Sequence, residues 1–190
     1  MFHRPLRMSL RIMLAVPTIV YALMGALYLV PAVRGFTGAS GYSFLAVTLT
    51  LSVMLVPFLM KQCEGLFQAA LLHQNSAASN SGFSVLQTFL WVIFPQCRTG
   101  FLALVFLGFC RSLGDTMIAL IVSGNTPVLV EGWLSPFRNL TAHIALMAPT
   151  DAYSLMYASS FVSLGLLLAF SVTISSVAYV LIFKNKRWLW

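Results

Sequence analysis

Charged residues are scarce in this sequence of 190 residues. Asp, Glu, Lys and Arg together make up 8% of it, whereas an ordinary soluble domain carries about 25%. Hydrophobic residues make up 59%, and the mean hydropathy is +0.91. So few charges cannot provide the polar surface of a soluble globule, and so much apolar sequence excludes a disordered chain. The composition indicates a membrane protein.

Cysteine is also rare, and the three cysteines, Cys63, Cys97 and Cys110, show neither a pairing pattern nor metal-ligand spacing. There is no Gly-rich nucleotide loop and no Gly-x-Ser-x-Gly elbow. We therefore expect no catalytic residue, no cofactor and no metal site, and we expect ATP hydrolysis only in a partner. The net charge of +7 does not indicate nucleic-acid binding, because most of the Lys and Arg residues flank apolar runs.

Four long apolar segments predict membrane-spanning helices. At a rise of 1.5 Å per residue, about 20 residues cross the roughly 30 Å hydrocarbon layer. Pro17 and Pro57 are tolerable inside such helices, because freed carbonyls find other donors. The sequence predicts an all-α integral membrane protein with a single transmembrane domain over residues 1–190 and spans at about 12–33, 42–60, 101–123 and 157–183.

The basic residues are unevenly distributed between the loops. Eight of them fall on one side of the predicted spans and two, Arg34 and Arg138, on the other. The positive-inside rule then places both termini and the region of residues 61–100 in the cytoplasm. Within that region, residues 83–94 show helical spacing and predict a short helix along the membrane surface that ends before Pro95. The eight bases are Arg4, Arg7, Arg11, Lys61, Arg98, Lys184, Lys186 and Arg187.

Two charged residues, Arg111 and Asp115, lie inside the third predicted span. A charge at a helix centre costs roughly 2.5–3.5 kcal/mol on insertion scales, so neither should face lipid unpaired. On a continuous helix they are neighbours on one face, and a mutual ion pair would neutralise both. Alternatively, Arg111 lines a translocation path and binds an oxyanion with its planar fork, while Asp115 holds it in place or competes for it. Thr116 could donate its hydroxyl to the same anion or to its own helix.

Three stretches carry a resemblance to a known family. Residues 14–31 read LAVPTIVYALMGALYLVP, and residues 111–125 read RSLGDTMIALIVSGN. Between them, Ser76-Ala77-Ala78 is followed by three residues and Gly82, with Pro95 thirteen positions further on. This spacing is that of the Glu-Ala-Ala-x-x-x-Gly coupling motif of ABC permeases. Together the stretches resemble the permease subunit of bacterial phosphate-specific ABC transporters, closer to the PstC type than to PstA.

The resemblance implies a type I ABC importer permease in the bacterial inner membrane. Such a subunit pairs with a sibling permease, receives phosphate from an extracytoplasmic binding protein and is driven by cytoplasmic ATPase subunits. It implies two sets of functional residues: Arg111, Asp115 and Thr116 for substrate binding, and Ser76, Ala77, Ala78 and Gly82 for coupling to the ATPase.

The chain departs from the family pattern in two respects. Ser76 stands where the coupling motif has glutamate, and the family has about six spans, so the chain resembles the last four. These departures suggest an alternative, a truncated, non-transporting membrane protein that assembles with or derives from such a permease.

Overall fold

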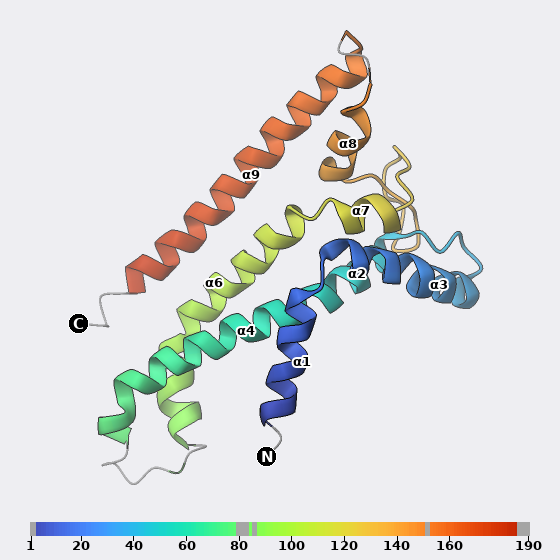
Figure 1. Ribbon diagram of the computed structural model, residues 1–190. Coiled ribbons are helices and arrows are strands. Elements are labelled where there is room, and N and C mark those ends of the chain that lie inside the picture. Colours follow the sequence, from blue (N-terminus) through green and yellow to red (C-terminus); the bar gives the residue numbers. More distant parts are fainter. Residues whose placement is uncertain (1–2, 79–83, 85–86, 151–152, 186–190) are drawn as a thin grey trace. The chain divides into compact units, whose positions relative to one another are not determined.

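The computed structural model describes residues 3–78, 84, 87–150 and 153–185, and these form helices joined by turns (Figure 1). Pairing of the β type is limited, in this part of the chain, to one isolated bridge between Gly124 and Phe137. The prediction of an all-α protein is therefore confirmed. In chain order the elements are α1 (His3–Ala15), α2 (Thr18–Met24), the π-helical turn η1 (Gly25–Leu29), α3 (Val30–Thr37), α4 (Phe44–Ala78), the π-helical turn η2 (Thr88–Ile93), α6 (Phe94–Leu113), α7 (Met117–Val122), α8 (Leu140–Met147) and α9 (Leu155–Asn185).

Three helical stretches among the described residues are long and apolar enough to cross a membrane. They are Thr18–Thr37, Phe44–Gln68 and Leu155–Val180. The first runs through α2, η1 and α3 without a break, and the other two lie in α4 and α9. The structure thus supports three of the four predicted spans, while the fourth span and the location of the termini stay predictions.

Proline has different effects at two positions. α1 ends at Ala15, and Pro17 has φ −60° and ψ 145°, so α2 starts at Thr18 in a new direction (Figure 1). A proline disfavours helical geometry in the residue before it, here Val16, so the single helix predicted over residues 12–33 is wrong at its start. Pro57, in contrast, lies buried inside α4 without ending it.

The third predicted span is not one helix. The structure ends α6 at Leu113 and starts α7 at Met117, which divides residues 101–123. At the other end, helical structure continues from Gln87 through η2 into α6, so the surface helix predicted to stop before Pro95 has no boundary there.

The chain forms two compact units, and α7 lies at the centre of the first. This unit comprises residues 1–57 and 111–172. α7 packs against α2, η1 and α8, with Ile118 and Val122 fully buried. Because six residues are too few for a stable isolated helix, these contacts keep α7 helical. The core of the unit consists of Tyr21, Ala22, Val30, Val33, Ala46, Val47, Met54, Ile118 and Val122.

The second unit, residues 58–110 and 173–190, packs the second half of α4 on α6. The rings of Phe67 and Phe101 meet edge to face with centroids 5.4 Å apart. A Cβ at Gly100 would lie 3.0 Å from the Leu66 side chain. Small residues on α6 therefore allow the leucines of α4 to approach closely, as is typical of helix packing in membranes.

Gly25 makes a comparable close approach in the first unit. It is buried in η1, and a Cβ there would lie 2.6 Å from Thr50 Oγ1 on α4 and 3.2 Å from Val122 Cγ2 on α7. The missing side chain thus lets three elements meet at one point.

Gly25→Ala should destabilise the protein by about 1–3 kcal/mol, the usual effect of overpacking. Thr50→Ala added to it should restore part of the loss, because it removes both clashing side-chain atoms. Thermal unfolding in detergent measures both effects. Gly35→Ala is the matched control, since nothing lies within 4 Å of a Cβ there. Equal losses of stability in Gly25→Ala and Gly35→Ala would contradict the packing argument.

Candidate functional site

The candidate site lies where α6 ends and α7 begins. Arg111 is exposed in the last turn of α6. Gly114, Asp115 and Thr116 are not helical, and the Asp115 backbone N–H donates to the Ser112 carbonyl over 3.3 Å. The chain turns here before α7 starts.

The Asp115 side chain caps α7. Its Oδ1 accepts a hydrogen bond of 2.9 Å from the backbone N–H of Ile118, and the residue is only 9% exposed. The Asp115 carbonyl accepts a 3.4 Å bond from the Thr141 hydroxyl on α8. An aspartate at this place satisfies one of the free N–H groups of the helix, and its charge is favoured by the helix dipole.

The break corrects the predicted relation between the two charged residues. Arg111 and Asp115 do not lie four apart on one helix, because the helix ends at Leu113. Each charge instead occupies a helix end that favours it: the guanidinium belongs to the last turn of α6 and the carboxylate to the start of α7. The carboxylate also has a backbone partner, the Ile118 N–H.

Thr116 is half-buried beside them. Its carbonyl accepts a 2.8 Å bond from the Leu120 N–H, as the N-cap residue of a helix does. The structure thus brings Arg111, Asp115 and Thr116 to one turn, and their predicted role in substrate binding stays a prediction.

The far end of α7 closes with Gly124 and Asn125. Both have positive φ, 81° and 52°, and Asn125 Nδ2 donates to the Leu120 carbonyl over 2.6 Å. Glycine and asparagine tolerate this left-handed geometry, which is typical of helix ends. Arg138 Nε donates in turn to the Asn125 carbonyl over 2.9 Å. The pair thus ends α7 and links it to Arg138.

The loop after α7 provides hydrogen-bond acceptors for the start of α4. The Trp133 carbonyl accepts from the Leu45 N–H over 2.9 Å, and the Ser135 carbonyl accepts from the Phe44 N–H over 3.2 Å. The Phe44 and Trp133 rings meet edge to face at 5.5 Å. The sequence analysis did not predict this contact, because the two segments lie about ninety residues apart in the chain.

The predicted coupling residues Ser76, Ala77 and Ala78 form the end of α4. Gly82 lies outside the described residues. Upstream on α4, Lys61 Nζ pairs with Glu64 at 3.0 Å. Among the residues that the structure describes, no group of three or more His, Cys, Asp or Glu side chains could hold a metal ion.

These features define a multi-pass helical membrane protein with a charged turn between two helices. The chain belongs to the family described as binding-protein-dependent transport system inner membrane component, whose profile matches residues 2–187. The expected location in the bacterial inner membrane agrees with this family. No solved structure matches it significantly.

Several relatives carry names for phosphate transport. The phosphate transport system permease protein PstC of Mesorhizobium japonicum is 26% identical over 87% of this chain and 57% of its own length. PstC of Pasteurella multocida is 25% identical over 97% of this chain and 64% of its own length. The probable ABC transporter permease protein YqgH of Bacillus subtilis is 28% identical over 84% of this chain and 52% of its own length.

The chain therefore spans about half to two thirds of the length of these relatives. Because they are permeases and the match extends over most of this chain, the comparisons do not favour the alternative of a non-transporting protein.

Asp115→Ala should destabilise the protein by about 0.5–2 kcal/mol, since α7 loses its cap. Asp115→Asn should be close to wild type, because the amide oxygen can still accept from the Ile118 N–H. Thermal unfolding of the purified variants in detergent distinguishes them. If Asn destabilises as much as Ala, the negative charge rather than the hydrogen bond holds the turn.

Proposed function

We propose that this chain is the membrane-spanning permease subunit of an ATP-driven phosphate importer and forms part of its translocation path. The observation that carries the proposal is the match of 87% and 97% of the chain to two proteins named as phosphate transport system permeases. The string of residues 111–125 adds to it, because it places a cation, an acid and a hydroxyl at one turn.

Arg111 is the proposed phosphate ligand. The residue is exposed in the last turn of α6, and the planar fork of a guanidinium suits bidentate contacts with an oxyanion. Thr116 is the proposed hydroxyl donor. Asp115 is a positioning residue in this proposal: its bond to Ile118 fixes the turn that separates the arginine from the threonine.

Arg111→Lys tests the substrate role. Lysine keeps the positive charge at the helix end but cannot make two parallel contacts with one phosphate. A hydrogen bond to a charged group contributes about 1.5–3 kcal/mol, so phosphate uptake at low concentration should fall about tenfold or more. The measurement is uptake of labelled phosphate in cells without other phosphate importers, normalised to membrane abundance and with all partner subunits present.

Arg34→Lys is the matched control, because Arg34 is likewise exposed in the last turn of a helix, α3. It should leave uptake unchanged. Near-normal uptake by the Arg111 variant would contradict the substrate role and leave the arginine as a charge that stabilises the end of α6.

The proposed partners are a sibling permease, cytoplasmic ATPase subunits that hydrolyse ATP, and an extracytoplasmic binding protein that delivers phosphate. The proposed coupling element is Ser76, Ala77, Ala78 and Gly82, of which the first three form the end of α4. Its support is the motif spacing and the helix that reaches Ala78.

Ser76→Glu should strengthen association with the ATPase, because it restores the acid of the motif and with it a charge-assisted contact of about 1.5–3 kcal/mol. Co-purification of the tagged chain with its ATPase measures the effect, which should rise about tenfold. Asn75→Glu adds the same charge one position away and should not have this effect. Equal or weaker co-purification of the Ser76 variant would contradict the coupling role.

A further inference from the structure

Helix α1 lies outside the candidate spans. It covers His3–Ala15 and ends shortly before Thr18, where the first candidate span begins. Its sequence, HRPLRMSLRIMLA, contains three arginines and no acidic residue. A basic helix that leads directly into a membrane span is placed next to the lipid headgroups.

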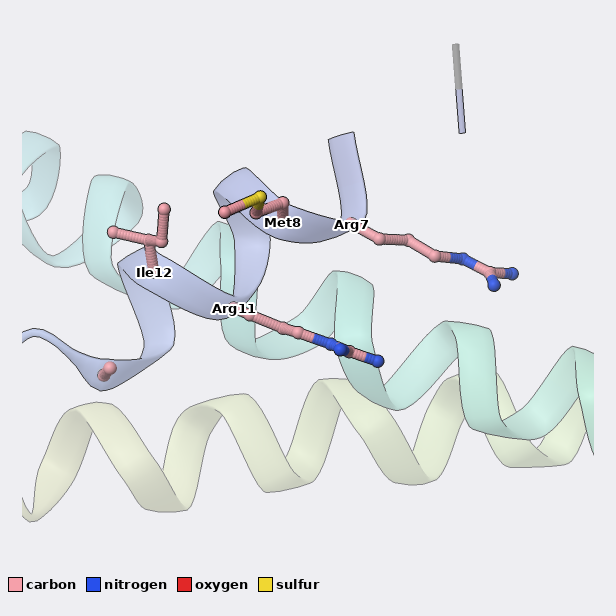
Figure 2. A pocket seen from close by; sticks show the side chains of 5 residues that line it. Arg7, Met8, Arg11 and Ile12 are labelled. Atoms are coloured by element: carbon pink, nitrogen blue, oxygen red, sulfur yellow. The ribbon is translucent and has the colours of Figure 1, made fainter. Parts of the chain in front are cut away.

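One strip of α1 combines cationic and apolar side chains. Arg7 and Arg11 are one helical turn apart, and so are Met8 and Ile12, which are 66% and 59% exposed. Together with Ala15 they line one open groove. Figure 2 shows the two arginine side chains extending in the same direction, with Met8 and Ile12 pointing to another side. Such a strip is typical of helices that lie in a membrane interface.

The start of the span holds α1 in place. The Tyr21 hydroxyl of α2 donates to the Met13 carbonyl of α1 over 2.7 Å. Val16, at the bend, packs against the core of the first unit. Because α1 is tied to the end of the span, its exposed strip stays at the level where the span leaves the bilayer.

We propose that α1 binds anionic phospholipid at the bilayer surface. The guanidinium groups of Arg7 and Arg11 contact the lipid phosphates, and Met8 and Ile12 enter the boundary with the acyl chains. An acidic protein surface would match the arginines but would leave the two exposed apolar side chains without a suitable environment. A lipid satisfies both, because its headgroup and acyl chain lie next to each other.

The test uses the whole chain in nanodiscs. A donor dye is attached at Ser9→Cys in a variant without native cysteines. Energy transfer from this dye to acyl-labelled phosphatidylglycerol is measured while the fraction of phosphatidylglycerol in a phosphatidylcholine bilayer is raised. The change Arg7→Gln with Arg11→Gln should raise the half-saturating fraction about 30-fold, the equivalent of about 2 kcal/mol for two basic residues near an anionic surface. Arg34→Gln, on α3, should leave it unchanged.

Three outcomes would overturn the proposal. Equal energy transfer to labelled phosphatidylcholine and phosphatidylglycerol would show that the headgroup charge is not recognised. An unchanged half-saturating fraction in the double variant, at an unfolding temperature equal to wild type, would exclude the two arginines. Displacement of the labelled lipid by millimolar inorganic phosphate would assign the arginines to a free anion.

A second measurement tests the orientation of the strip. A nitroxide at Ile12→Cys should be more accessible to oxygen, which partitions into lipid, than to a water-soluble nickel complex. The matched control is a nitroxide at Leu129→Cys, in the loop after α7, where the side chain is 89% exposed. Its accessibility should be the same with and without the double glutamine change. Greater accessibility of residue 12 to nickel would show that the strip faces water, and this would also overturn the proposal.

Discussion

The hydrogen bond from the Ile118 N–H to the Asp115 carboxylate is the interaction on which the first unit depends. It allows the chain to stop one helix at Leu113 and start another at Met117. The new helix can then bury Ile118 and Val122 among α2, η1 and α8. A buried carboxylate thus stabilises the start of the helix that fills the core of this unit.

The same turn changes how the charges of Arg111 and Asp115 are understood. Ionisable residues in a membrane protein need compensation, and an ion pair is the first solution that a sequence suggests. Here one charge lies at a helix C-terminus and the other at an N-terminus, and the helix dipoles favour both. The carboxylate is occupied by the cap, and the guanidinium lies at an exposed helix end. For a permease this division is useful, since the group that stabilises the fold is not the group proposed to meet the substrate.

The sequence predicted the helical class and the approximate places of three spans, because long apolar runs between charges have few alternatives. It did not predict the break at Gly114. The mean hydropathy of a long segment does not show a break at one residue. The spacing of four between Arg111 and Asp115 also suggested one continuous helix. The sequence Gly114-Asp115-Thr116 does contain a helix-start signal, an aspartate before an apolar run. Whether this signal starts a helix depends on the hydrogen bond from Thr141 and on the burial of Ile118. Both are tertiary interactions that the local sequence does not contain. The predicted coupling residues stay untested for a different reason, because Gly82 lies outside the described residues.

The loop that covers the start of α4 has a consequence for biosynthesis. The N–H groups of Phe44 and Leu45 find their acceptors in Ser135 and Trp133, about ninety residues later in the chain. While the ribosome is still making α6, these donors have only water or lipid headgroups available to them. These two N–H groups at the start of α4 therefore gain their protein acceptors only after the loop that follows α7 has been made. The order of synthesis and the order of folding differ at this point of the chain.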